Sequence, residues 1–346
     1  MNNLLIVDGS ALLSIIFFAS VSDLMKITKD VDVIDEAIDG FFRKGHEHYT
    51  ENVGSFISTI FGIKDALMAS SMVIVFDKNS DSTFRKKLYP AYKATRTRNP
   101  AAIKDQMLVL HCILNKIGVK ALWDNEYEAD DLAGSIVCSM HDRFDNIYLF
   151  TRDRDWLQLL RPNVKAVIPM KDIKEAESFR TYYSDITENN PFSYGYPRVY
   201  GRNLCITQDI CKDFYGVAPE QVIDLKGLAG DSSDNIPGIK GVGDEIARAL
   251  LELFGGMDEV FENLSELSED EFKSRTRVLI KRCPYKALKN GYDDARMSRK
   301  LATIVNNIDI MISTEELKVS IDRRNLNTAI RIYNLENDLD FLMKTQ

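Results

Sequence analysis

Five clusters of acidic residues have the type and spacing that could bind metal ions. Three follow short apolar runs directly, a fourth opens a helical pattern in EADDLAGSIV, and the fifth is an i, i+3 pair expected on one helical turn. The clusters are Asp8; Asp77; Glu128, Asp130 and Asp131; Asp153 and Asp155; and Asp231 and Asp234. Any one of them could be an ordinary turn or helix-cap residue. Five such clusters in one chain favour a shared site.

The chemistry of such a site follows from its charge. Nine carboxylates in one place would repel one another strongly unless cations neutralised them. Oxygen-only ligand sets, without His or Cys, favour Mg²⁺ or Mn²⁺ over zinc. Two such ions about 4 Å apart are a common device for phosphodiester hydrolysis, because they activate water and stabilise the charge developing on the phosphate. A small-molecule phosphatase would also explain the acids.

A basic segment follows Asp77 closely along the chain. Residues 84–98 (FRKKLYPAYKATRTR) contain six basic residues and no acid, with Tyr89 and Tyr92 among them. The basic residues are Arg85, Lys86, Lys87, Lys93, Arg96 and Arg98. Basic side chains interleaved with aromatic rings are typical of surfaces that contact nucleic-acid phosphates and stack on bases. The alternative is a solvated basic loop. A phosphatase would leave this segment unexplained.

The glycine-rich stretch GIKGVG at 238–243 follows Pro237 and precedes a helical pattern. Glycines at this spacing allow a tight turn that aims backbone N–H groups at a phosphate, and Lys240 adds a positive charge. The motif alone is weak and is often a plain turn. Between two short helices it indicates a helix–hairpin–helix that grips the duplex backbone without reading bases.

The elements that must position these residues can be read from the apolar pattern. Five short apolar runs alternate with helical patterns, which predicts an α/β layer with a mainly parallel sheet. The expected strands are Leu4–Val7, Met72–Phe76, Val119–Leu122, Ile147–Phe150 and Lys165–Ile168, and the expected helices are Val53–Ala69, Ala101–Ile117 and Glu128–Met140. Asp8, Asp77 and the 153/155 pair then follow the carboxyl ends of strands, where open parallel sheets build their sites.

The second part of the chain has a different pattern. Residues 170–202 are polar and lack a clear period, which we interpret as an extended connection or insertion. From Ile206 onward the pattern is helical, with Val222–Leu228 and Asp244–Phe254 flanking the glycine stretch, and no strand is expected. We therefore expect two domains, 1–205 and 206–346.

Composition excludes several classes of protein. The 346 residues carry a net charge of -8, so coating nucleic acid through bulk positive charge is a poor explanation. Five scattered cysteines without a C-x-x-C pair fit reduced thiols rather than a disulfide scaffold or zinc ribbon. No segment reaches the roughly 18 apolar residues of a membrane span, so we expect a cytoplasmic protein with no membrane partner. His46 and His48 are expected to be exposed, and Trp123 and Trp156 to belong to the core.

Seven motifs together resemble the 5′ nuclease family. They occur in order as VDGS (7–10), VFD (75–77) with FRKKLYPAYKATR, YEADD (127–131), TRDRDWLQLL (151–160), GDSSDNIPGIKGVG (230–243) and SRKLATI (298–304). The family includes the 5′→3′ exonuclease domain of bacterial DNA polymerase I, free-standing exonucleases and flap endonucleases. The resemblance covers roughly residues 3–310 and implies a free-standing member.

The resemblance implies a PIN-like α/β nuclease domain followed by an all-α helix–three-turn–helix domain. It implies that all nine acids bind two Mg²⁺ or Mn²⁺ ions, and that Lys93 and Arg96 contact the scissile phosphate from an arch of about residues 84–100. It also implies DNA contacts by Arg85, Lys86, Lys87, Tyr92 as a stacking residue, Arg98, Gly238, Lys240, Gly241 and Gly243. The hairpin is further expected to hold a K⁺ ion.

The implied partners are flapped, nicked or branched DNA, with RNA–DNA hybrids as an additional class, bound by a monomer. Two departures bear on activity: Ser14-Ile15-Ile16 replaces a Tyr-Arg helix, and Arg152 stands where the family has glycine. The insertion at 170–202 has no clear counterpart. A catalytically weakened binder of branched DNA is therefore the alternative function.

Overall fold

The sheet is built from runs of apolar residues that are buried on both faces. The computed structural model describes residues 2–42, 48–78, 82–170 and 203–333, together with Leu335, Leu339 and Leu342. Its six strands are β1 (Asn3–Asp8), β2 (Ala69–Asp77), β3 (Lys120–Asp124), β4 (Asn146–Phe150), β5 (Val164–Pro169) and β6 (Asn203–Ile206). Their order is β3-β2-β1-β4-β5-β6, and every pairing is parallel except that of β5 with β6.

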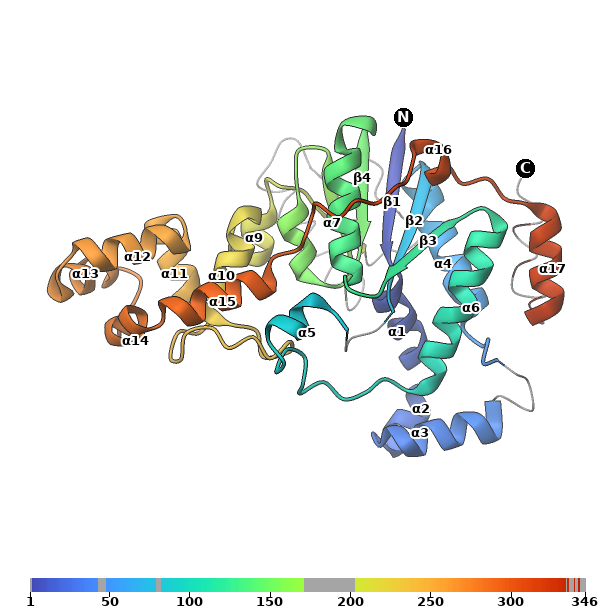
Figure 1. Cartoon of the computed structure of the whole chain (residues 1–346), viewed down its shortest axis with the longest axis horizontal. Coiled ribbons are helices and arrows are strands. Elements are labelled where there is room, and N and C mark those ends of the chain that lie inside the picture. The colour runs from blue at the N-terminus through green and yellow to red at the C-terminus, as the bar shows by residue number, and fades with distance from the viewer. Residues whose placement is uncertain are drawn as a thin grey trace.

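Alternation along β1 divides the core between the two faces of the sheet. Leu5 and Val7 join the apolar cluster formed with α1, α4, α6 and α17, whereas Leu4 and Ile6 join the cluster formed with α7. The helices concerned are α1 (Gly9–Ser20), α4 (Val53–Ala66), α6 (Ala101–Ile117), α17 (Arg323–Tyr333) and α7 (Ala129–Met140). Figure 1 shows this layered arrangement around the central strands. The sheet is therefore covered on both sides, as parallel sheets require.

Short helices connect these layers. They are α2 (Ser22–Ile27), α3 (Val31–Ala37), the π-helical η1 (Ile38–Phe42), α5 (Phe84–Leu88), η2 (His141–Arg143) and η3 (Arg154–Leu159). The arch expected at about 84–100 thus begins as the short helix α5 and continues as turns to residue 96.

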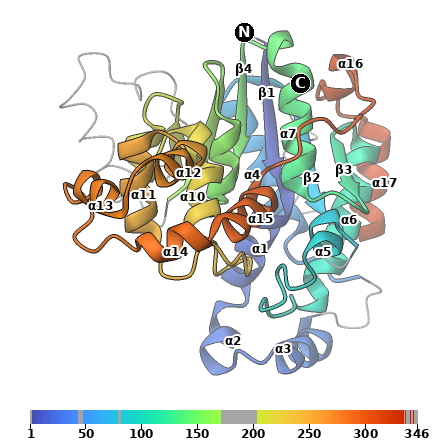
Figure 2. The same cartoon turned by 60° about the vertical axis from the view of Figure 1, so that its left-hand side comes forward.

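The second part of the described chain is helical after β6. Its helices are α9 (Cys211–Tyr215), η5 (Pro219–Gln221), α10 (Val222–Ala229), α11 (Asp244–Phe254), α12 (Met257–Glu266), α13 (Glu269–Thr276), α14 (Tyr285–Asn290) and α15 (Tyr292–Ala302). Helix α10 packs against α15 and α11. Figure 2 shows this helical domain projecting from one side of the sheet. Its own apolar cluster includes Leu225, Leu250 and Leu288.

The chain then returns from the helical domain to the sheet. Ile304 and Leu317 are buried in the cluster beside α7, and Ser71 of β2 forms an isolated antiparallel bridge with Lys318. After α16 (Thr314–Leu317), helix α17 packs against α6 at the far side of the sheet (Figure 1). Residues from about 304 onward therefore complete the first domain, although the sequence division placed them with the second.

The predicted α/β layer followed by helices agrees with this architecture, with two local corrections. Helix α4 stops at Ala66, because Met68 has a positive φ of 50° and β2 already begins at Ala69. Strand β6 was not expected; it is four residues long and pairs antiparallel with β5. The insertion predicted at 170–202 lies, from residue 171, outside the described residues, as does His46.

Three further expectations can be compared with the structure. All five cysteines are described and none forms a disulfide. Trp156 is buried in the core, whereas Trp123 is partly exposed and stacks on His111 with ring centroids 3.6 Å apart. His48 is partly exposed, and its Nδ1 lies 2.8 Å from Oδ1 of Asp105. Within the described ranges, no helix is both long and apolar enough to cross a membrane.

Candidate active site

The acidic clusters converge at the carboxyl edge of the sheet. Asp8 and Asp77 are the last residues of β1 and β2, and Asp153 follows β4 by three residues. Strand β1 lies between β2 and β4, so the strand order reverses at this point of the sheet. Such a switch point leaves a crevice at the carboxyl ends of the strands, where open α/β sheets bind ligands.

Asp8 is held by the first turn of α1 and by the loop after β4. Its Oδ1 accepts a hydrogen bond from the Ala11 N–H at 2.9 Å, and its Oδ2 accepts one from Thr151 Oγ1 at 2.8 Å. Burial, reinforced by the charges of Asp77 and Asp153, raises the pKa of Asp8 from 3.8 to about 7. The fold thus holds an acidic group where its charge is opposed by its neighbours.

Asp77 is fixed by two backbone hydrogen bonds. Its own N–H donates to Ser10 Oγ at 2.8 Å, and its Oδ1 accepts from the Ala129 N–H at the start of α7, also at 2.8 Å. Burial raises the pKa of Asp77 even though Lys93 opposes the shift. Asp77 therefore joins the end of β2 to the third acidic cluster.

The third cluster begins α7. Glu128 is the N-cap residue, and it forms a capping box with Asp131, whose Oδ2 accepts the Glu128 N–H at 3.1 Å. Burial raises the pKa of Asp130 well above its ordinary value. Burial would also raise the pKa of Glu128, but the charges of Lys93 and Arg85 lower it on balance.

Arg85 corrects one sequence prediction. Its guanidinium is 1% exposed and donates to both carboxylate oxygens of Asp131, at 2.6 and 2.7 Å. It also donates to Glu128 at 3.1 Å and to the backbone carbonyls of Leu301 and Thr303. A buried guanidinium in this position cannot contact DNA. Arg85 instead neutralises the third cluster and ties the arch to the segment that returns from α15.

The fourth cluster caps the short helix η3. Asp153 accepts a hydrogen bond from the Asp155 N–H at 2.9 Å, and its own N–H donates to Thr151 Oγ1 at 2.9 Å. Burial raises the pKa of Asp155 from 3.8 to about 7, with Asp153 adding to the effect. Asp155 also forms an ion pair with Lys226 of α10. Arg152, which stands where the resemblance implies glycine, is exposed.

The fifth cluster lies in a loop of the helical domain, not on a helical turn. Asp231 and Ile236 exchange backbone hydrogen bonds of 2.9 and 2.8 Å, which close a tight turn between α10 and the hairpin. Asn235 adopts a left-handed conformation with φ of 55° inside this turn. The turn directs Asp234, which is 8% exposed, toward the first domain.

Lys93, Arg96 and Tyr92 of the arch contact Asp234 in this loop of the helical domain. Lys93 Nζ lies 2.6 Å from Glu128 Oε1 and 3.9 Å from Asp234 Oδ2, and Arg96 forms an ion pair with Asp234. The Tyr92 hydroxyl lies 2.9 Å from Glu128 Oε2 and 3.2 Å from Asp234 Oδ2. Tyr92 is only 3% exposed, so the expectation that it stacks on a base is wrong for this arrangement of the arch.

The other basic residues of the arch are also paired. Lys86 donates to the Tyr92 carbonyl at 2.7 Å, and Lys87 pairs with Glu126 at 2.9 Å. Arg98 pairs with Asp35 at 2.7 Å and with Asp32, which links the end of the arch to α3. Lys87, Arg96 and Arg98 remain exposed and are therefore available to a phosphate once these pairs exchange.

The glycine hairpin has a buried side and an exposed side. Gly238 has φ of 59°, and a Cβ there would lie 2.2 Å from the Gly230 nitrogen, so only glycine fits. The Gly238 N–H donates to the buried Ser298 hydroxyl at 2.9 Å, which anchors the turn on α15. Lys240, Gly241 and Gly243 are exposed. The hairpin therefore presents a lysine and open backbone to solvent, as a phosphate contact requires.

The charges of the site suit divalent cations. The donors are all carboxylate oxygens, and burial raises the pKa values of Asp8, Asp77, Asp130 and Asp155, because it disfavours charged carboxylates that no cation neutralises. Lys93, Arg96 and Lys226 occupy positions between the carboxylates. In the part of the chain that the structure describes, no three acidic side chains already form a closed metal cage. Binding a cation would therefore require these basic side chains to withdraw.

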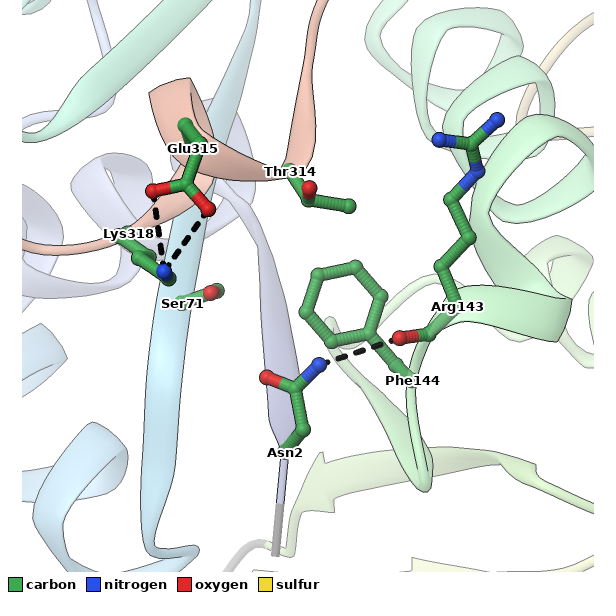
Figure 3. Close-up of a pocket in the computed structure, with 7 residues that line it drawn as sticks. All are labelled: Asn2, Ser71, Arg143, Phe144, Thr314, Glu315 and Lys318. Atoms are coloured by element: carbon green, nitrogen blue, oxygen red, sulfur yellow. Dashed lines mark hydrogen bonds and ion pairs between the residues drawn. The ribbon is translucent and has the colours of Figure 1, made fainter.

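A separate pocket of about 300 Å³ lies at the opposite end of the sheet. Figure 3 shows it between Asn2, Phe144 and the Glu315–Lys318 pair, at the amino ends of β1 and β2. It contains none of the acidic clusters.

Sequence reasoning missed two residues of the site. Thr151 joins Asp8 to Asp153 through its hydroxyl, and Lys226 joins Asp155 to Asp231. Thr151 stands within the TRDRD motif, so its position was a usable signal. Lys226 lies on an ordinary helical pattern, and only the packing of α10 against η3 brings it to the acids.

Two family models match the chain over both domains. The N-terminal resolvase-like domain of 5′–3′ exonucleases matches residues 3–186, more than half of the chain, and the C-terminal SAM fold of 5′–3′ exonucleases matches residues 217–325. The chain belongs to the 5′–3′ exonuclease family. The predicted family, its nuclease fold and the helical domain that follows are therefore confirmed, and this family member is a phosphodiester-hydrolysing nuclease.

Individual relatives agree with this membership. The 5′–3′ exonuclease of Buchnera aphidicola subsp. Baizongia pistaciae is 27% identical over 80% of this chain and 80% of its own length. The DNA polymerase I of Caldicellulosiruptor bescii is 30% identical over 91% of this chain but only 30% of the polymerase. The family member described here thus spans about a third of the length of such polymerases.

Solved structures show the same fold at low sequence identity. T5 5′-exonuclease with bound divalent metal ions (zinc) has a TM-score of 0.59 and 20% identity, covering 96% of this chain and 100% of that one. Human GEN1 in complex with Holliday junction DNA has a TM-score of 0.53 and 13% identity, covering 96% and 67%. These likenesses, which extend over 96% of the chain, show the fold of both domains.

Proposed function

We propose that this nuclease cleaves 5′ flaps and 5′ ends of branched or nicked DNA with the help of two divalent cations. The observation that carries the proposal is the convergence of acids from five separate segments at the switch point of the sheet, beneath a basic arch. The exposed face of the glycine hairpin lies in the adjoining domain, where it would hold the duplex. RNA–DNA hybrids would bind to the same arch and hairpin residues, because the hairpin would contact only the sugar–phosphate backbone of the nucleic acid and would not read its bases.

The acidic residues fit hard cations, and we assign them to Mg²⁺ or Mn²⁺. The ligands would be drawn from Asp8, Asp77, Glu128, Asp130, Asp131, Asp153, Asp155, Asp231 and Asp234. Asp131 is the least accessible of these, since it is fully buried against Arg85, and we expect it to act by orienting Glu128. When bound, the cations would supply an activated water and stabilise charge on the phosphate. The T5 5′-exonuclease structure with bound divalent metal ions (zinc) supports the use of divalent cations, while the choice of Mg²⁺ or Mn²⁺ rests on the oxygen-only donors.

The protein's own cations would position the substrate. Lys93 and Arg96 now neutralise Glu128 and Asp234, and a DNA phosphate would offer them an equivalent negative partner. Their transfer to the phosphate would orient the scissile bond over the acids. Lys86, Lys87 and Arg98 would contact the flanking strand, while Lys240, Gly241 and Gly243 would hold the duplex, with K⁺ bound by the hairpin backbone. Gly238 is buried and would act by shaping the turn and not by a DNA contact. The structure of T5 D15 flap endonuclease in complex with DNA and metal ions supports DNA as the substrate class.

The test is cleavage of a 5′-labelled flap duplex by the full chain in Mg²⁺, with EDTA as the control. Release of a short labelled fragment from near the junction, only with Mg²⁺, is the expected result. Asp153→Asn should abolish cleavage yet bind the flap about as tightly as the wild-type chain, because it removes one charge without disturbing the arch or the hairpin. Asp142→Asn, at an exposed position of η2, is the matched control.

Two outcomes would contradict the proposal. Tight binding of the flap without cleavage, in both Mg²⁺ and Mn²⁺, would identify a binder of branched DNA. Rapid hydrolysis of a free phosphate monoester with no action on the flap would instead identify a phosphatase. Size-exclusion chromatography with light scattering tests the accompanying expectation of a monomer.

A further inference from the structure

Lys226 occupies the junction between the two domains. Its ammonium group forms ion pairs with Asp155, from the loop after β4, and with Asp231 at 2.5 Å, from the turn after α10. All three side chains are nearly buried, with exposed fractions of 11% for Lys226, 13% for Asp155 and 16% for Asp231. One ammonium therefore joins carboxylates that come from different domains.

The position of Lys226 is fixed by its helix. Helix α10 packs against α15, α11 and η3, and the backbone at Gly227 lies against Met257 and Arg299. A Cβ at Gly227 would approach the Met257 sulfur to 2.8 Å. Helix α10 is therefore closely packed beside Lys226, and rotation of the lysine side chain is the simplest way for its ammonium to leave the acids.

Lys93 makes a similar contact, but it lies on a segment that can move more easily than helix α10. It bridges Glu128 and Asp234, but it belongs to the arch, whose turns after α5 include exposed residues 94–99. A rearrangement of the arch on DNA binding would carry Lys93 away from the acids as a unit. Lys226 has no such route, because its helix forms part of the core of the second domain. The two lysines thus differ in what displaces them.

We propose that Lys226 is a built-in counter-ion that competes with one of the two divalent cations for Asp155 and Asp231. The inference rests on the proposed use of divalent cations. A cation on the Asp8 and Asp77 side faces Lys93, which the arch can carry away as a unit, whereas a cation at Asp155 and Asp231 must first displace the Lys226 ammonium, whose helix belongs to a core. The two sites therefore fill in order, the Asp155 and Asp231 site last and most weakly.

The charge of Lys226 strengthens this competition. Both carboxylates contact the same ammonium group, which is nearly buried between them. Its displacement therefore breaks two ion pairs in a nearly dry environment, and the free ammonium must be rehydrated. In the metal-free protein the same pairs hold the two domains together.

The test measures Mn²⁺ binding by the full chain, with free Mn²⁺ followed by electron paramagnetic resonance. The wild-type chain should bind two ions with unequal affinities. Lys226→Met removes the charge at similar size and should tighten the weaker site by about tenfold, on the order of one buried charge pair. Its melting temperature without metal should fall and its gain on adding Mn²⁺ should exceed that of the wild type. Lys212→Met, at an exposed position of α9, is the control.

Each outcome decides between the proposals. An unchanged or weakened second site in folded Lys226→Met would overturn the role of Lys226 while leaving the nuclease proposal intact. Absence of any Mn²⁺ binding by the wild type would instead contradict the metal assignment. If Lys226→Met does not fold without metal, Lys226→Arg provides the test. The arginine guanidinium should pair with both carboxylates and weaken Mn²⁺ binding at the second site. Tighter Mn²⁺ binding at that site would contradict the proposed role of Lys226.

Discussion

At the scale of single residues, the site is organised by pairs of opposite charge. Lys93, Arg96 and Lys226 each contact an acid that we assign to the metal ions, and Arg85 contacts Asp131 and shares Glu128 with Lys93. Such pairs allow many carboxylates to be folded together without metal. We expect Lys93, Arg96 and Lys226 to give up these partners when cations and a phosphate bind.

Arg85 gives the clearest test of a structural role. Arg85→Met would leave Asp131 and Glu128 buried without their partner, which should cost about 3–5 kcal/mol of the free energy of unfolding. Chemical denaturation measures this loss. Lys87→Met, which removes an exposed pair with Glu126, should change the stability by less than about 1 kcal/mol. If both variants were equally stable and Arg85→Met bound DNA weakly, Arg85 would be a DNA-contacting residue and not a structural one.

The raised pKa of Asp8 predicts how pH and metal affect stability. Asp8 titrates near 7 in the folded protein and near 3.8 otherwise, so the folded state holds the extra proton between these values. Without metal, the free energy of unfolding should therefore fall as pH rises through this window. Mg²⁺ replaces the proton, so it should raise the melting temperature more at about pH 8 than at about pH 5.

Asp8→Asn checks this assignment. The variant should melt higher than the wild type in EDTA at about pH 8, because a repelled charge is gone, and it should gain less from Mg²⁺. Differential scanning fluorimetry at both pH values measures these shifts. A melting temperature for Asp8→Asn below that of the wild type in EDTA would mean that Asp8 is stabilised as a carboxylate by its hydrogen bonds.

At the scale of elements, sequence and structure agree where the signal is local. The strands that end at Asp8 and Asp77 and the helix Asp244–Phe254 are continuous patterns, and the structure has them where they were expected. Strand β6 has only four residues, and it exists through its pairing with β5. The arch shows the same limit: Arg85 looks like its neighbours in sequence, and only contacts with distant segments bury it.

The turn at Ser233–Asn235 controls how firmly the arch is held. Asn235 donates to the Ala91 carbonyl at 2.7 Å, and the Lys93 N–H donates to the Asp234 carbonyl at 2.8 Å. Asn235→Ala removes the side-chain bond and places alanine at a positive φ, with a cost of roughly 1–2 kcal/mol. We expect trypsin to cut after Arg96 and Arg98 at least about fivefold faster while the global melting temperature changes little.

Mass spectrometry of the early tryptic fragments measures these cuts directly. Ser232→Ala, at an exposed neighbouring position, is the control, and trypsin should cleave it at the wild-type rate. If trypsin also cleaved Asn235→Ala at that rate, the arch would be held by its ion pairs with Glu128 and Asp234 alone.

At the scale of the whole molecule, the two domains are interleaved. The chain leaves the first domain at β6, builds the helical domain, and returns to place Ile304, Leu317 and Leu326 in the core around the sheet. The acids of the site follow the same route, since Asp231 and Asp234 come from the second domain. Substitutions that weaken the packing of the returning segment should therefore destabilise the first domain and, with it, the site.

Leu317→Ala tests this dependence. Leu317 is 1% exposed in the cluster beside α7, so its truncation should lower the free energy of unfolding by about 2–5 kcal/mol. Met311→Ala, in the same segment but 87% exposed, should change it by less than about 0.5 kcal/mol. Urea denaturation compares the two. Similar small effects in both variants would show that the returning segment adds little to the first domain.

The return of the chain also sets an order of events during synthesis. While residues up to about 300 emerge from the ribosome, the apolar faces that will receive Ile304, Leu317 and α17 remain uncovered. The sheet can form early, but its core closes only after those later residues have left the exit tunnel. A nascent chain of this design therefore acquires a finished nuclease centre only after its returning segment has been translated.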